Sequence, residues 1–337
     1  MMYPVYDFRL QMTQVCTQKC RHCFADSKKT IKGELSTDEI IKFIKNDLIP
    51  RGLKWVTLTG GEPLIRFDDC LEITKFCAKN EIIPRLNTGG LVPDIESKIE
   101  TLISEGMETI MLPLKSFYRD KHDGFCGVTG CFDQTINTFK TIAKLNGTSC
   151  LRTTLFNWNI EDIPKLISLA RDIGISKFRF RPELPSGRAL KHNEYPTINQ
   201  VIEVTKLVLM EKKSKNFPNI EFLNPCFQFL YSDKVNDYSQ CPCGITKLFL
   251  TSKGSIKPCG FYKNTFGNIR ETSFEDLWNS NPHFVIKKIR SSYIFKQCTD
   301  CKYWNICKGG CPVVIYNEND NFDGYNRYCP IQHNIQY

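Results

Sequence analysis

The sequence has no run of 18 consecutive apolar residues, no low-complexity tract and no internal repeat. The first absence excludes a transmembrane helix, because a helix needs about 20 mostly apolar residues to cross a bilayer. Residues 1–15 lack a basic stretch followed by an apolar one, so they do not resemble a secretory signal. We therefore expect a cytoplasmic protein without a membrane partner.

Long runs of one charge are missing as well. The chain carries 45 Lys and Arg against 36 Asp and Glu, a net charge of +9, but the basic residues are scattered. We interpret most of them as a solvated surface and expect no nucleic-acid partner. With 337 residues, 41% hydrophobic and 24% charged, the chain can form a sizeable core and is not globally disordered.

Cysteine, by contrast, is abundant. The chain holds 17 cysteines, an odd number, and many of them are closely spaced. Disulfides rarely persist in a reducing compartment, so such clusters favour metal or iron–sulfur ligation over a disulfide framework.

Strand-like and helix-like segments alternate through the first two-thirds of the chain. Ser36 and Glu39 have capping-box spacing at the start of the first expected helix, and Pro50 is expected to end it. The expected strands are 8–13, 55–59, 82–87, 109–114, 150–155 and 176–180, and the expected helices follow at 36–48, 68–79, 95–104, 132–145, 160–172 and 197–212.

This alternation predicts an α/β fold with a parallel sheet. Six units are too few for a closed eight-fold barrel, so we expect a partial (β/α)6 TIM-like barrel over residues 1–215, with its chemistry at the carboxyl ends of the strands. Residues 212–219 are polar and are interpreted as a linker. The second predicted domain, residues 216–337, is loop-rich and holds nine of the 17 cysteines, so we expect it to fold around metal.

Two loops carry the strongest signal in the first domain. Cys16, Cys20 and Cys23 follow the first expected strand, and three thiolates can hold three irons of a cubane cluster while leaving the fourth iron open. A zinc knuckle or chance clustering is the alternative. Gly60-Gly61-Glu62-Pro63 follows the second strand, where two glycines let the backbone approach a ligand and Pro63 fixes the loop; an ordinary turn is the alternative.

Taken together, these loops resemble the radical S-adenosylmethionine (SAM) superfamily, over roughly residues 5–215. The resemblance implies that the three cysteines bind a 4Fe–4S cluster whose open iron chelates the methionine part of SAM. Gly60, Gly61 and Glu62 would hold its amino group. Reduction would release a 5′-deoxyadenosyl radical that abstracts a substrate hydrogen.

The same resemblance suggests further contacts to SAM. His22 stands where the family often has Tyr or Phe beside the adenine, and Thr88 lies in a segment similar to the family's third-strand end. The resemblance implies that Arg152 on the fifth strand contacts the carboxylate or ribose of SAM; the alternative is a core strand whose one arginine is capped. The sequence departs from many relatives at Lys115, where they carry a Ser-Leu-Asp segment.

A second cysteine pattern occupies the C-terminal part and resembles the SPASM extension of this superfamily. All seven of its cysteines match the spacing of that extension: Cys241, Cys259, Cys298, Cys301, Cys307, Cys311 and Cys329. The resemblance implies two auxiliary 4Fe–4S clusters, one on the set 298, 301, 307 and 329 and the other on 241, 259 and 311. Zinc ribbons are the alternative.

The second auxiliary set lacks one thiolate. Three clusters would need eleven cysteines, and the two motifs supply ten. Cys243, beside Cys241, is our preferred eleventh ligand; Cys226 and an open iron remain as alternatives.

Three functions compete on the sequence alone. The leading hypothesis is a peptide maturase that crosslinks or oxidises a side chain of a ribosomally made peptide or protein. Only 15 residues precede Cys16, so we expect leader recognition by a separate protein or an intrinsic groove, and a flavodoxin- or ferredoxin-type electron donor. The second is radical modification of a small molecule such as a haem precursor or an aminoglycoside sugar. There Lys115, Arg179 and Arg181 pair with substrate carboxylates, or are plain surface charges. The third is a non-enzymatic electron carrier.

Overall fold

The computed structural model describes residues 2–27, 31–212, 219–223, 241–291 and 298–334. These residues form one curved sheet of nine strands in the order β7-β6-β5-β4-β3-β2-β1-β8-β9. All neighbouring strands are parallel except β8 and β9, which are antiparallel. The strands are β1 (Asp7–Gln11), β2 (Trp55–Thr59), β3 (Ile83–Asn87), β4 (Thr109–Pro113), β5 (Thr148–Leu155), β6 (Lys177–Pro182), β7 (Asn219–Phe222), β8 (Lys247–Leu250) and β9 (Ile256–Lys257).

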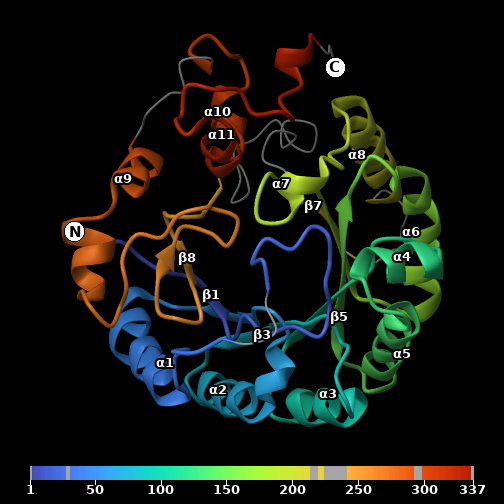
Figure 1. Ribbon diagram of the computed structural model, residues 1–337, viewed down its shortest axis with the longest axis horizontal. Coiled ribbons are helices and arrows are strands. Elements are labelled where there is room, and N and C mark those ends of the chain that lie inside the picture. The colour runs from blue at the N-terminus through green and yellow to red at the C-terminus, as the bar shows by residue number, and fades with distance from the viewer. Residues whose placement is uncertain (1, 28–30, 213–218, 224–240, 292–297, 335–337) are drawn as a thin grey trace.

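Helices cover the outer side of the curved sheet, and the loop after β1 lies inside the curve (Figure 1). This arrangement confirms the expected α/β partial barrel. No helix in the described ranges has both the length and the apolar character needed to cross a bilayer. The helices are α1 (Thr37–Phe43), α2 (Phe67–Lys79), α3 (Ile95–Ser104), α4 (Arg119–Cys126), α5 (Cys131–Lys144), α6 (Ile163–Ile173), α7 (Ala189–His192), α8 (Ile198–Lys212), α9 (Phe284–Arg290), α10 (Trp304–Cys307) and α11 (Pro312–Asn319).

The first helix begins as its capping box predicts. The Ser36 side chain accepts a hydrogen bond from the Glu39 amide at 3.2 Å, and the Glu39 carboxylate accepts one from the Ser36 amide at 2.8 Å. The expected end at Pro50 is wrong. After α1 the helical segment continues through a π turn, 44–48, and a 3₁₀ turn, 49–51, and it ends at Gly52. Gly52 has φ +80°, a left-handed conformation that glycine adopts at little cost.

Strands from the C-terminal part complete both edges of the sheet. β7 pairs with β6, opposing Ile220 to Phe178, and β8 pairs with β1, opposing Leu248 to Phe8. Residues beyond 215 therefore extend the sheet that residues 1–215 begin, on both sides. The division of the chain into two domains at 215 stays a prediction.

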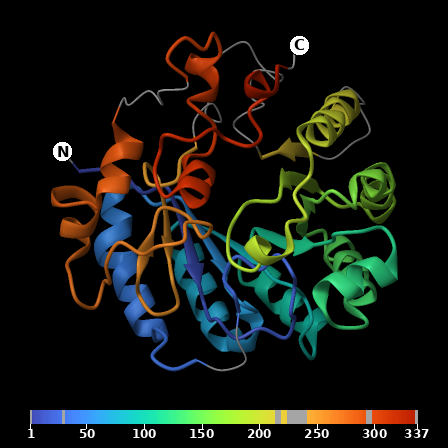
Figure 2. The ribbon, with the colours of Figure 1, turned by 45° about the horizontal axis from the view of Figure 1, so that its top comes forward.

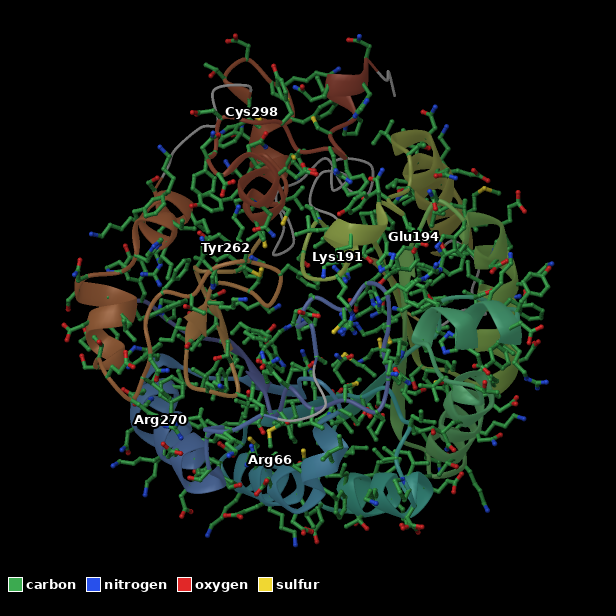
Figure 3. The ribbon with its side chains drawn as sticks, in the orientation of Figure 1. Arg66, Lys191, Glu194, Tyr262, Arg270 and Cys298 are labelled. Atoms are coloured by element: carbon green, nitrogen blue, oxygen red, sulfur yellow. The ribbon has the colours of Figure 1, made fainter. Side chains whose placement is uncertain are left out.

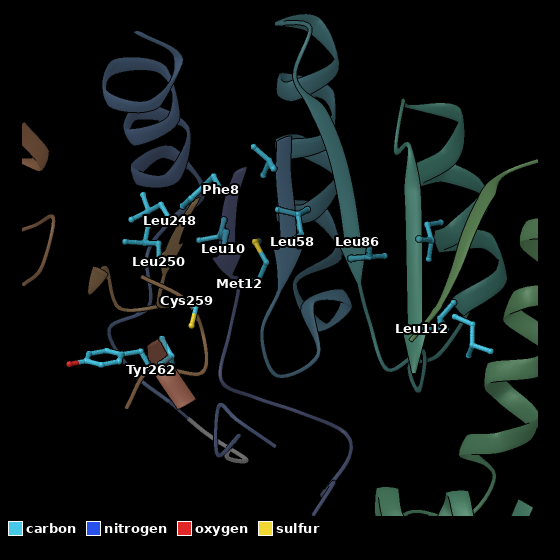
Figure 4. Close-up of a cluster of buried hydrophobic side chains, with 14 of the residues drawn as sticks. Phe8, Leu10, Met12, Leu58, Leu86, Leu112, Leu248, Leu250, Cys259 and Tyr262 are labelled. Carbon is cyan, nitrogen blue, oxygen red and sulfur yellow. The ribbon is translucent and has the colours of Figure 1, made fainter. Parts of the chain in front are cut away.

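The barrel core forms where apolar side chains of adjacent strands meet the helices. Phe8 and Leu10 of β1, Leu58 of β2 and Leu86 of β3 are all fully buried, and Figure 4 shows them side by side across the sheet. Phe8 also packs edge-on against Phe43 of α1, with ring centroids 5.8 Å apart. This continuous core holds the carboxyl ends of the strands, and the loops that follow them, in place.

The C-terminal segments lie against the loop that follows β6. The Asn317 side chain on α11 donates hydrogen bonds to the carbonyls of Pro185, at 2.8 Å, and Phe261, at 2.7 Å. Figure 2 shows these segments, in orange and red, on the same side of the sheet as the β1 loop. The cysteine-rich C-terminal part therefore borders the open mouth of the barrel.

Candidate functional site

The three cysteines after β1 face one cavity. Cys16, Cys20 and Cys23 are half-buried free thiols and line a hollow of about 890 Å³, a volume that includes space open to solvent. Burial raises the pKa of the Cys16 thiol to about 12. Bound iron would reverse this, because thiolates ligate metals in their deprotonated form. Three thiols around one open space fit the three protein ligands of a cubane cluster.

The loop after β2 is hydrogen-bonded through its backbone to the segment that leads to these cysteines. The Gly61 amide donates to the Thr13 carbonyl at 2.6 Å, and the Glu62 amide donates to the Val15 carbonyl at 2.7 Å. A Cβ atom on Gly61 would lie 2.0 Å from the Val15 oxygen, and one on Gly60 would lie 2.6 Å from the Thr13 oxygen. The two glycines are thus required by the contact between the two loops, in addition to lining the cavity.

Glu62 is buried behind the cavity wall. Its carboxylate accepts hydrogen bonds from the Thr88 hydroxyl at 2.6 Å, the Gly89 amide at 2.8 Å and the Leu64 amide at 3.1 Å. Glu62 and Pro63 are not among the residues that line the cavity. In this structure Glu62 fastens the loop after β2 to the loop after β3. Gly60, Gly61 and Thr88, by contrast, do line the cavity.

A segment after β6 clamps the cysteine loop from the opposite side. The Arg188 amide donates to the Cys23 carbonyl at 3.0 Å, and the Arg188 guanidinium donates to the Cys20 carbonyl at 2.9 Å. Gly187 has φ +55°, and a Cβ atom there would come within 2.3 Å of the Cys23 oxygen. The segment 185–189 therefore positions the thiols through the backbone of their loop.

The His22 ring lies in the cavity wall against two phenylalanines. Its centroid is 4.9 Å from that of Phe125 and 5.8 Å from that of Phe156. Burial, together with the neighbouring Lys115 and arginines, lowers the pKa of His22 well below its usual value. A neutral ring in an aromatic wall suits stacking on an adenine, as the resemblance implied.

Arg152 also faces the cavity, from β5. Its Nη1 atom donates to the Asn87 side-chain oxygen at 2.7 Å, which aims the guanidinium toward the loop after β3. Burial and the nearby Arg9 and Arg181 lower the pKa of Arg152 to about 9, so it stays charged at neutral pH. A carboxylate in the cavity would find a charged partner there.

Four cysteines surround a second hollow, in the C-terminal part. Cys298, Cys301, Cys307 and Cys329 line a space of about 470 Å³ whose wall includes Trp304. In Figure 3 Cys298 is labelled at the top of the molecule, far from Arg66 beside α2. These four are the cysteines that the sequence assigns to one auxiliary cluster.

The other auxiliary set is joined by Cys243. The Cys243 thiol lies close enough to the thiols of Cys241 and Cys259 to shift the pKa values of all three, and Cys311 lies near enough to raise the pKa values of Cys241 and Cys259. The structure thus brings four thiols together, which favours Cys243 as the fourth ligand. Cys226, the alternative ligand, lies outside the described residues.

These thiol groups are arranged for clusters more than for single ions. Within the described part of the chain, no three His, Cys, Asp or Glu side chains converge tightly enough to hold one metal ion. A cubane takes one thiolate on each iron, so its ligands need not converge on a point.

Comparison with known proteins agrees with both cysteine patterns. Residues 10–170 match the family profile of the Radical SAM superfamily, and residues 241–302 match that of SPASM, an iron–sulfur cluster-binding domain. The chain belongs to the radical SAM superfamily. It is an enzyme of that superfamily with a SPASM domain, and the electron-carrier hypothesis is set aside.

The relatives of this radical SAM enzyme include a heme synthase and a bacteriocin biosynthesis protein. It is 27% identical to the AdoMet-dependent heme synthase of Methanosarcina barkeri, over 95% of this chain and 94% of that protein. It is 23% identical to AlbA of Bacillus subtilis, an antilisterial bacteriocin subtilosin biosynthesis protein, over 92% and 67%. Among solved structures it is similar to Streptococcus suis SuiB bound to its precursor peptide SuiA, with a TM-score of 0.78, 18% identity, and coverage of 97% and 76%. That structural likeness shows a shared fold.

Other residues at the site of this radical SAM enzyme were not predicted. The Gln18 side chain accepts a hydrogen bond from the Cys20 thiol at 3.3 Å and donates to the Gly89 carbonyl at 3.3 Å. In the sequence, the position of Gln18 between Cys16 and Cys20 was the only feature that could have pointed to this role. The thiol of Cys126, on the unpredicted helix α4, does not line the cavity but lies close enough to Cys20 to lower the pKa of that thiol.

Proposed function

We propose that this radical SAM enzyme modifies a side chain of a ribosomally made peptide or protein, by crosslinking or oxidation. The observation that carries the proposal is the solvent-open cavity that holds the three-cysteine loop and reaches Phe261 in the cysteine-rich C-terminal part. A substrate side chain entering that cavity would meet the triad and, from the C-terminal part, the Phe261 ring. The similarity to the bacteriocin biosynthesis protein AlbA and to the fold of peptide-bound SuiB supports a peptide substrate.

The residues present fit three 4Fe–4S clusters and SAM. The triad would hold the first cluster, and the two cysteine groups of the C-terminal part would hold the auxiliary ones. When bound, the first cluster and SAM supply a 5′-deoxyadenosyl radical that abstracts hydrogen from the substrate. The chain's own part is to hold SAM with Gly60, Gly61, Thr88 and Arg152 and to keep His22 uncharged beside it.

A small carboxylate-bearing molecule is the second candidate substrate. Five cationic side chains line the cavity, and the heme synthase of M. barkeri is similar over nearly the whole of both chains. Haem precursors carry several carboxylates, so they would suit such a wall.

Supply of electrons and recognition of the leader complete the proposal. We expect a flavodoxin or ferredoxin to reduce the clusters and a separate protein or a groove to bind the peptide leader. Cysteines without disulfides among the described residues suit a reducing compartment, so we place the enzyme in the cytoplasm.

One experiment separates the two substrates. Anaerobically reconstituted enzyme is given reductant, SAM and the low-mass fraction of a host extract, and 5′-deoxyadenosine is quantified. Stimulation that disappears after protease treatment of the extract supports the peptide, whereas stimulation that survives supports the small molecule. Enzyme that carries its clusters and forms no 5′-deoxyadenosine in any condition contradicts the proposed function.

A further inference from the structure

The cavity beside the cysteine triad has a one-sided charge. Among the described residues that line it there is no Asp or Glu, although five cationic side chains are present: Lys115, Arg152, Arg179, Arg181 and Arg188. Burying charges of one sign is costly unless a partner of the other sign is supplied. We therefore looked for the negatively charged or hydrogen-bonding partner of each of the five side chains.

Three of the five have an evident role. Arg179 forms an ion pair with Glu221 at 2.7 Å, and Arg188 binds the carbonyl of Cys20 and the Asp26 carboxylate. Arg152, held by Asn87, is the expected partner of the SAM carboxylate. Lys115 and Arg181 remain.

Lys115 is buried, and the two hydrogen bonds of its ammonium go to uncharged oxygens. It is 4% exposed, and its ammonium donates to the Thr154 hydroxyl at 3.2 Å and to the Arg152 carbonyl at 3.5 Å. Within the described residues it forms no ion pair. Burial, followed by repulsion from Arg181 and Arg152, lowers the pKa of Lys115 to about 7. An anion bound beside Lys115 would stabilise its charged form and so raise its pKa again.

Arg181 is similarly incomplete. Its guanidinium lies over the Phe261 ring, 4.0 Å from the centroid, and its Nη1 atom is buried with no hydrogen-bond partner among the described residues. The nearest acid, Glu183, forms no ion pair with it, and one Glu183 carboxylate oxygen, Oε2, is buried without a partner. Burial raises the pKa of Glu183 to about 7, so this side chain is only a partial counter-charge.

We propose that Lys115 and Arg181 together bind a carboxylate group of the substrate. A guanidinium offers two parallel N–H donors to a carboxylate and an ammonium offers a third, all strengthened by charge. Both residues line the cavity of the triad, so a carboxylate held there anchors the substrate beside the radical source. The inference rests on the proposed function, because it takes this cavity to be the place of hydrogen abstraction.

The same chemistry serves either substrate. A peptide brings Asp, Glu or C-terminal carboxylates, and a small polycarboxylate brings several on one scaffold. Two probes represent these sources: the capped peptide N-acetyl-Glu-Glu-Glu-amide and tricarballylate. Their neutral counterparts are N-acetyl-Gln-Gln-Gln-amide and tricarballylamide.

Binding is measured by calorimetry on the reconstituted holoenzyme with SAM and without reductant. We expect at least one acidic probe to bind about tenfold to a hundredfold more tightly than its amide, the effect of one or two charge-assisted hydrogen bonds. Lys115→Met and Arg181→Met should each abolish most of this preference. The more tightly bound probe then indicates whether the carboxylate comes from a peptide or a small molecule.

Lys177→Met is the matched control. Lys177 begins the strand that carries Arg181, pairs with Glu108 at 3.4 Å and does not line the cavity, so its replacement removes the same charge elsewhere. It should keep both the preference for carboxylates and the 5′-deoxyadenosine formation of the wild type. Circular dichroism and iron content verify that each variant is folded and loaded.

The inference is overturned if wild-type enzyme binds acidic and neutral probes equally, which needs no variant to show. It is also overturned if Lys177→Met reduces the preference as much as Lys115→Met does, since the attraction would then be non-specific. The proposed function fails separately, through absence of 5′-deoxyadenosine from cluster-loaded wild type.

Discussion

A methyl group on Gly61 would lie 2.0 Å from the carbonyl oxygen of Val15. This contact joins the loop after β2 to the chain that delivers Cys16, one residue further on. The cysteine motif and the glycine motif, 37 residues apart in their nearest members, are therefore one structural unit. The loop after β2 cannot shift without moving the chain that carries the thiols.

Gly61→Ala should separate the two loops. The added methyl group meets backbone, which cannot rotate away, so we expect a loss of about 3 kcal/mol or more in unfolding free energy. Melting temperature and iron content measure this. Gly124→Ala is the control, because a Cβ atom there meets nothing within 4 Å; it should leave the iron content unchanged and, since Gly124 lies inside helix α4, keep or slightly raise the melting temperature. Equal melting temperatures for Gly61→Ala and wild type would refute the close contact.

Glu62→Gln should weaken the fold as well as SAM cleavage. The carboxylate accepts from the Thr88 hydroxyl and from the Leu64 and Gly89 amides, and an amide side chain would point a donor at one of those donors. We expect a loss of about 1–3 kcal/mol in stability. A variant with wild-type stability and impaired SAM cleavage would instead show that Glu62 contacts SAM directly.

Replacing Cys16, Cys20 or Cys23 by Ala should abolish 5′-deoxyadenosine formation. Each replacement removes one of the thiols that face the cavity, and iron per chain should fall by roughly one third if one of three clusters is lost. Cys77→Ala is the control, since that thiol is buried in α2 outside the cavity. Reductive SAM cleavage retained by a purified triad variant would contradict the assignment.

Cys243→Ser should lower the iron content of the auxiliary sites, because the Cys243 thiol lies close enough to those of Cys241 and Cys259 to share a cluster with them. Cys226→Ser should not. Iron analysis and the electronic spectrum of each variant decide between the two cysteines. A loss confined to Cys226→Ser would reverse the preference, and no loss in either would indicate an open iron.

Binding of an acidic probe should weaken as pH rises. The pKa of Lys115 is about 7, so Lys115 is charged below that pH and neutral above it. Its charged neighbours Arg152 and Arg181 lower this pKa, whereas Glu183 and Cys20 raise it; the imidazoles of His22 and His122 are held uncharged.

Glu183, whose pKa is also about 7, gains negative charge over the same range and acts in the same direction. Calorimetry from about pH 6 to about pH 8.5 should show falling affinity, with a shallower fall in Lys115→Met. Affinity that rises with pH would contradict these charges.

The strands could be predicted closely, because each is a short apolar segment and these segments alternate with helical segments along the chain. The strand 55–59 was predicted to the residue, and 8–13 only in part, since β1 ends at Gln11. The helix α4 was missed, because its sequence, RDKHDGFC, is polar and short. The pairing of β7 and β8 with the sheet was missed too, since four-residue strands leave little pattern.

The sequence by itself determined the chemistry of this protein. Cysteine spacing is a local property, so the chain alone displayed the two cysteine patterns, and their resemblance to the radical SAM motif and the SPASM extension implied the two groups of auxiliary ligands. Tertiary structure decided what faces the cavity. It placed the Glu62 carboxylate between the loops after β2 and β3, brought the Cys243 thiol near those of Cys241 and Cys259, and left Lys115 and Arg181 in the cavity wall without an ion pair among the described residues. These relationships join residues that are distant in sequence. Only folding brings them together and decides which charged side chains are buried away from water.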